Sequence, residues 1–124
     1  MSYDIRIVRG NGTRVMFPER HNITGGTYAL GGACEAWLNV TYNYYQFYHD
    51  ALGEKGIRTI YGMDIRDAMP ILDSAIAKLG DEPPDEDYWK ATPGNARDAL
   101  ENLKKIAELA LKYYPNDDMF WSGD

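Results

Sequence analysis

The chain has 124 residues, of which 44% are apolar and 26% charged, and its formal net charge is −6. This size and composition are typical of one globular domain and argue against disorder. The excess of carboxylates excludes ordinary nucleic-acid binding, which needs cations against the phosphates.

Three features predict a cytoplasmic protein. No apolar run approaches the roughly 18 residues that cross a bilayer, so no membrane contact is expected. The N-terminus lacks the basic and apolar regions of a secretory signal. Cys34 is the only cysteine, which leaves no internal disulfide and no thiolate metal cluster.

The acidic charge is concentrated in the second half of the chain. Residues 1–63 contain six Lys/Arg and five Asp/Glu, a net charge of +1, whereas residues 64–124 contain seven Lys/Arg and fourteen Asp/Glu, a net charge of −7. An acidic surface of this kind attracts basic partners. The alternative is a solvated face that only keeps the protein in solution.

Strands are predicted first along the chain. Residues 3–8 and 13–17 alternate in side-chain type on either side of a Gly-Asn-Gly turn, which predicts a β-hairpin that Pro18 ends. Residues 27–30, between two glycine pairs, predict a short strand, and residues 34–42 predict a longer one.

Three helices are predicted after the strands. Apolar residues recur at helical spacing over residues 44–52 and over about 65–79. The third helix has the clearest ends, because Thr92 caps it, Pro93 takes its first position and Pro115 closes it.

The segments around these helices carry less pattern. Asn43 is the predicted cap of the first helix, and residues 57–61 predict either a short strand or an extended connector. If Asp67 caps the second helix, Pro70 falls in its first turn, whereas a cap at Asp64 requires Pro70 to kink the helix. A distorted first turn near Asp64, with regular helix from Asp67, is favoured. Residues 80–87 form an acidic, proline-containing connector, and the apolar tail at residues 119–121 is expected to pack back on the body.

Together the elements predict one α+β domain over residues 1–124. Strands precede helices without βαβ alternation, which favours a small antiparallel sheet packed by about three helices. The sheet would contain the N-terminal hairpin and two further strands.

Patterns for metal, cofactor or nucleophile chemistry are weak, so no metal site and no cofactor is expected. His21 and His49 are the only histidines, are not spaced as ligands and are interpreted as surface residues. Residues 25–32 contain glycines but no phosphate-loop lysine. Cys34 is interpreted as a small buried hydrophobe, and Gly94 at the third helix start is a weak anion signal.

One face of the predicted strand over residues 34–42 carries hydrogen-bonding groups around an aromatic ring, namely Glu35, Trp37, Asn39 and Thr41. This row is either a binding face, with Trp37 stacking on a ligand, or the solvent face of a sheet edge. Glu35 is the only carboxylate in that strand and is the candidate acid or base if the protein is an enzyme.

Ten tyrosines are unusual for this length and suit an interface as well as a core. Tyr45 lies off the apolar stripe of its helix and is the best candidate for an exposed contact. Arg58, with Tyr61 near it in sequence, offers a cation beside aromatic faces, as does Arg97, and such a pair suits a nucleotide base and phosphate.

Four stretches carry a resemblance to a family, namely GGTYALGGACEAWLNVTYNY, GIRTIYGM, DYWKATPGNA and the ending FWSGD. Together they span most of the chain. Through these stretches the protein resembles a family of small, acidic, uncharacterised proteins from phages and conjugative elements of gut Firmicutes and related bacteria. The resemblance implies a mobile element in a bacterial cytosol and no particular mechanism.

The acidic C-terminal half, the tyrosine surplus, the small size and the lack of catalytic signatures favour one leading hypothesis. It is a non-enzymatic binding protein of a mobile element that acts on a host protein, as a counter-defence inhibitor does. A second hypothesis is a module that binds a small ligand or nucleotide, and a third is an enzyme that uses Glu35. The tyrosines also leave open a homodimer.

Overall fold

A computed structural model describes residues 2–24 and 32–124 of the chain. It contains five strands, three α-helices and two short 3-10 helices. The strands are β1 (Ser2–Arg9), β2 (Met16–His21), β3 (Ala33–Glu35), β4 (Trp37–Thr41) and β5 (Met119–Gly123). The helices are η1 (Tyr42–Tyr44), α1 (Tyr45–Leu52), η2 (Gly56–Ile60), α2 (Ile65–Lys78) and α3 (Pro93–Tyr113).

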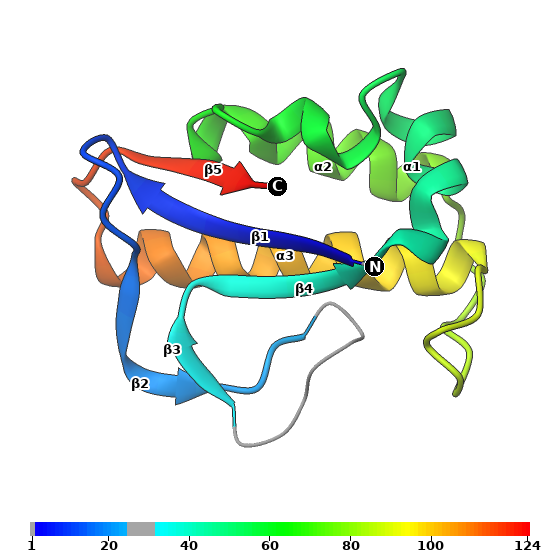
Figure 1. Cartoon of the computed structure of the whole chain (residues 1–124), viewed down its shortest axis with the longest axis horizontal. Coiled ribbons are helices and arrows are strands. Elements are labelled where there is room, and N and C mark those ends of the chain that lie inside the picture. Colours follow the sequence, from blue (N-terminus) through cyan, green and yellow to red (C-terminus); the bar gives the residue numbers. More distant parts are fainter. Residues whose placement is uncertain (1, 25–31) are drawn as a thin grey trace.

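The strands form two antiparallel sheets, so the predicted α+β class with about three helices is confirmed. The larger sheet has the order β4-β1-β5, and the smaller one pairs β2 with β3. Figure 1 shows α3 running behind the larger sheet, with α2 beside the β5 edge. α3 therefore covers one face of that sheet, and α2 flanks its β5 edge.

Alternation along the strands builds the core. Alternate residues in the interior of β1, β4 and β5 share one face of the sheet, and seven of these side chains are almost fully buried. They are Tyr3, Ile5, Ile7, Leu38, Val40, Met119 and Trp121. The apolar stripe of α3 lies on the other side of this core, and its buried alanines, such as Ala99 and Ala107, leave room for close packing.

One edge of β1 is divided between two partners. β4 pairs with residues 2–6, and the returning arm of the predicted hairpin pairs only near its turn, through a bridge between Val8 and Arg14. The hairpin is therefore short, because β4 occupies the rest of that edge. After this arm the chain diverges from β1 and continues as β2. The sequence predicts a strand that ends at Pro18, but β2 continues past the proline to His21.

The predicted strand over residues 34–42 is two strands separated by a bend at Ala36. The Ala36 N–H donates to the Val15 carbonyl, and its own carbonyl accepts from the Ile7 N–H, both at 2.9 Å. Ala36 thereby marks the point where the chain passes from the smaller sheet to the larger. Cys34 in β3 is half-buried instead of enclosed as predicted, and the strand predicted over residues 27–30 lies outside the described residues.

The helices differ from the prediction at their ends. Asp64 caps α2 by accepting from the Arg66 N–H at 2.8 Å, and the helix runs on from Ile65 with Pro70 inside it, not with a distorted first turn. Pro70 is exposed, so water can reach the carbonyl that its missing N–H leaves free. Residues 57–61 are neither strand nor extended connector, since η2 covers most of them.

The C-terminal tail packs on the body as predicted, and it does so as a strand. β5 pairs with the second half of β1, opposite the edge that β4 takes. Trp121 is only 1% exposed. Residues 80–92 carry no helix or strand and lie beyond the N-terminal end of α3, near α1, where Figure 1 colours them yellow-green.

Candidate functional site

The predicted binding row on residues 35–41 is occupied by hydrogen bonds within the protein. Asp4 of β1 lies opposite Asn39 in the register, and its Oδ1 accepts from Trp37 Nε1 at 3.1 Å and from Asn39 Nδ2 at 2.9 Å. Thr41 is buried, and its hydroxyl accepts from the Asn43 N–H, which caps η1. These groups join the strands to each other and to the first helical turn.

Glu35 pairs with two arginines. Its Oε2 accepts from Arg6 Nε at 2.8 Å, and its Oε1 lies 3.5 Å from Arg14 Nη1. Both carboxylate oxygens therefore have a guanidinium partner, whereas a general acid must present a proton to a substrate. The arrangement links β1, the hairpin arm and β3, as a structural ion-pair network does.

Arg58 lies over an aromatic pair at the other end of β1. Its guanidinium carbon is 5.1 Å from the Tyr3 ring centroid and 6.0 Å from that of Tyr42, and these two rings are 4.3 Å apart. Arg58 also donates to the Tyr42 hydroxyl at 3.3 Å and to the Asp124 carbonyl at 2.8 Å. Its cation thus already has protein partners.

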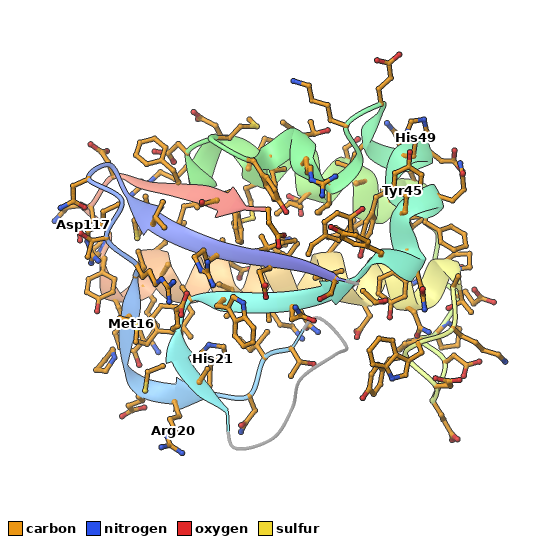
Figure 2. The ribbon with its side chains drawn as sticks, viewed as in Figure 1. Met16, Arg20, His21, Tyr45, His49 and Asp117 are labelled. Carbon is orange, nitrogen blue, oxygen red and sulfur yellow. The ribbon has the colours of Figure 1, made fainter. Side chains whose placement is uncertain are left out.

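Tyr61 and Tyr45 have different surroundings. The Tyr61 ring packs against Gly123, where a Cβ would lie 2.4 Å from the Tyr61 Cζ. Burial raises the pKa of Tyr61 well above its ordinary value. Tyr45 is 51% exposed, which confirms the predicted exposure. Figure 2 labels Tyr45 and His49 on α1. The rings of these two residues stack with their centroids 5.7 Å apart.

His21 is buried, and the predicted surface position is wrong because β2 continues to this residue. Its Nδ1 accepts from the Ile23 N–H at 3.2 Å, so Nε2 carries the proton and donates to the Glu35 carbonyl at 2.7 Å. Within residues 2–24 and 32–124, no three His, Cys, Asp or Glu side chains cluster as metal ligands.

The strongest candidate surface is the segment over residues 80–92, here called the acidic loop. Five of its side chains are carboxylates and one is a lysine, so its formal charge is −4; the carboxylates are Asp81, Glu82, Asp85, Glu86 and Asp87. Every residue from 81 to 90 is exposed. Among them are two adjacent aromatic residues, Tyr88 at 44% and Trp89 at 51% exposure, with ring centroids 5.6 Å apart.

One buried side chain holds the acidic loop. Asn95 of α3 is 3% exposed, and its Oδ1 accepts from the Asp85 N–H at 2.8 Å. Its Nδ2 donates to the carbonyls of Asp87 at 3.1 Å and Lys90 at 2.9 Å. Three backbone groups of the loop are thus tied to one amide on a helix.

The aromatic pair is fixed from the other side by η1. The Tyr44 hydroxyl donates to the Tyr88 carbonyl, and Asn43 Nδ2 donates to the Trp89 carbonyl at 2.6 Å. Burial, with nearby Asp98 and Asp87, raises the pKa of Tyr44 to about 12. Asn43, the predicted cap of α1, therefore binds the acidic loop. Tyr44 takes the cap position instead, and its side chain makes no capping hydrogen bond to the helix.

The start of α3 is closed by the same loop. A Cβ on Gly94 would lie 2.4 Å from the Pro83 carbonyl oxygen and 2.7 Å from that of Glu82, so only glycine permits this approach. These carbonyls pack against Gly94, so the acidic loop is in close contact with the first turn of α3. Arg97 Nη1 donates to the Gly80 carbonyl at 2.9 Å and so secures the beginning of the loop.

The sequence indicates that the loop is acidic but does not directly indicate that its backbone is held in one conformation. Asn95 stands three residues after Thr92, where a capping box would place Glu or Gln, and this departure is a signal that the side chain has another partner. The adjacent Tyr88 and Trp89 in an otherwise charged run are a second signal.

Protein-family models, curated proteins and solved structures were each compared with the chain, and none of the three comparisons gives a significant match. No helix in the described ranges combines the length and the apolarity needed to cross a membrane.

Proposed function

We propose that the chain is a protein-binding module whose acidic loop contacts a basic surface on another protein. The observation that carries this proposal is the exposed Tyr88–Trp89 pair, held in place within a segment of net charge −4. Tyrosine and tryptophan are the side chains most often responsible for binding energy at protein interfaces.

The order of the loop supports the proposal energetically. When a mobile loop becomes fixed on binding, the lost conformational freedom reduces the binding free energy by roughly 0.5–1.5 kcal/mol for each immobilised side chain. Here Asn95, Tyr44 and Asn43 already hold the backbone around the aromatic pair. Carboxylates around that pair would draw a basic partner and set its orientation.

The partner in this proposal is a host protein. The resemblance to mobile-element proteins supports a bacterial host. The inhibitory role of a counter-defence protein is part of the proposal and does not come from the resemblance. Ligand binding at the strand face has less support, since Trp37 and Asn39 donate to Asp4 and Arg58 has protein partners.

The test is affinity capture from host lysate with two charge-matched variants. The loop variant carries Asp81→Lys, Glu82→Lys and Glu86→Lys, which spares Asp85 and Asp87 because their carboxylates accept backbone N–H groups within the loop. The control variant carries Glu19→Lys, Glu54→Lys and Asp118→Lys, exposed positions outside the loop.

Both variants have a formal net charge of 0, since three reversals add +6 to −6. We expect the wild-type chain and the control variant to retain the same basic protein, and the loop variant to lose it. Release should also follow added salt, because exposed charges are screened. Equal retention by the two variants would rule out the acidic loop as the contact.

A further inference from the structure

A groove of about 220 Å³ lies at the base of the acidic loop. It is lined by Phe47, Asp50, Ala51, Lys78, Leu79 and Pro93. Leu79 immediately precedes the acidic loop and Pro93 immediately follows it, so both ends of the loop border the groove. On α1, Phe47 lies four residues after Asn43, whose side chain holds the Trp89 carbonyl. The groove thus borders both ends of the acidic loop and the helix that follows η1, whose Asn43 holds the backbone of the aromatic pair.

The lining is mainly apolar. Phe47, Ala51, Leu79 and Pro93 contribute carbon surface, and Phe47 and Leu79 are each only partly buried. The Lys78 ammonium lies 3.4 Å from the Ala51 carbonyl, at the C-terminal end of α1, so this cation has a partner within the protein. Asp50 adds one more carboxylate near the acidic loop.

We infer that this groove receives one apolar side chain from the partner segment whose cations meet the acidic loop. The inference rests on the proposed function and adds the chemistry of the partner: a basic segment with an apolar residue among its lysines or arginines. Sites for drug-sized ligands have volumes of roughly 300–1,000 Å³, so this smaller groove suits a single side chain better than a cofactor. The negative charge of the loop selects a cationic segment to carry that side chain.

Two synthetic peptides serve as probes. Both are lysine-rich and have the same length and charge, and they differ at one central position, which is leucine in the first and serine in the second. Fluorescence anisotropy of the labelled peptides at low ionic strength gives their affinity for the whole chain. Burying the leucine should make the first peptide bind roughly tenfold more tightly than the second.

Two leucine variants locate the effect. Leu79→Ser removes apolar surface from the groove and should abolish the preference for the leucine peptide. Leu109→Ser changes another partly buried leucine, on α3 in a depression beside Ile23, and should leave the preference intact. If Leu79→Ser unfolds the protein, contacts between the peptide leucine and the Phe47 ring, observed by NMR in the unaltered chain, test the same point.

The outcomes separate the groove from the loop. Equal binding of the two peptides by the unaltered chain, or a preference that survives in folded Leu79→Ser, would overturn the groove while leaving the loop as the contact. Failure of both peptides to bind would overturn the proposed function itself. If the Asp81→Lys, Glu82→Lys, Glu86→Lys variant binds neither peptide, this supports the contact between the loop carboxylates and the lysines that both peptides carry.

Discussion

Replacing Asn95 by alanine should loosen the acidic loop. The substitution removes three hydrogen bonds, which join the Asn95 amide to the backbone of Asp85, Asp87 and Lys90. A hydrogen bond of this kind contributes about 0.5–1.5 kcal/mol net, so the three together contribute about 1.5–4.5 kcal/mol. Because the loop residues are exposed and water can replace part of the loss, we expect the free energy of unfolding to fall by about 2 kcal/mol.

Two measurements follow this change. Thermal unfolding monitored by circular dichroism should show a midpoint lower by roughly 6–12 °C for a domain of this size. Amide hydrogen exchange should accelerate most at Asp85, whose N–H loses its acceptor. Asn102→Ala is the matched control on the same helix, because the Asn102 side chain makes one bond, to the Thr24 carbonyl. Unchanged exchange at Asp85 in Asn95→Ala would refute the role given to this amide.

Three further substitutions test neighbouring parts of the account. Tyr44→Phe should lower stability by about 1 kcal/mol and shift Trp89 emission, whereas Tyr114→Phe, which loses a similar bond to the Met16 carbonyl, should leave that emission unchanged. The pKa of Tyr44 is raised from an ordinary 10 to about 12 in the folded state, so its neutral hydroxyl stabilises the fold fully below pH 10. This stabilisation is lost as the pH rises towards 12. In Tyr44→Phe, the free energy of unfolding measured in urea should therefore fall less steeply over this alkaline range. Gly94→Ala, which in an open helix would gain about 1 kcal/mol, should instead destabilise the protein in thermal melts, because its Cβ meets the Pro83 carbonyl. Glu35→Gln should cost about 1–2 kcal/mol in urea unfolding by weakening both arginine contacts, and a neutral result would count against a structural role for that carboxylate.

The sequence was most informative where the signal is local. The capping hydroxyl of Thr92 and the proline after it predict the start of α3, and both take those positions. Alternation in β1 predicts a strand and its buried face. It does not reveal which strand pairs with which edge, because β4 and the hairpin arm compete for one edge of β1 and the winner depends on contacts distant in sequence.

The candidate site shows the same division. Charge counts identify the acidic loop, since net charge needs no structure. The ordering of the loop depends on an amide that bonds to backbone groups five to ten residues away, and composition carries no trace of such contacts. Trp37 and Asn39 show the reverse case, in which the sequence predicts a free binding face that the structure uses internally. Their alternation indicates a polar face, but it does not reveal that Asp4 on the neighbouring strand accepts hydrogen bonds from both side chains.

Site-specific photocrosslinking tests whether the acidic loop is the surface that contacts the partner protein. Benzoylphenylalanine is placed at Trp89 in one preparation and at Tyr45 in the other, two aromatic residues that are each 51% exposed on different segments. After irradiation in host lysate, we expect a covalent adduct with a basic protein from position 89 and none with that protein from position 45. The same adduct from both positions, or an adduct from position 45 alone, would contradict binding through the acidic loop.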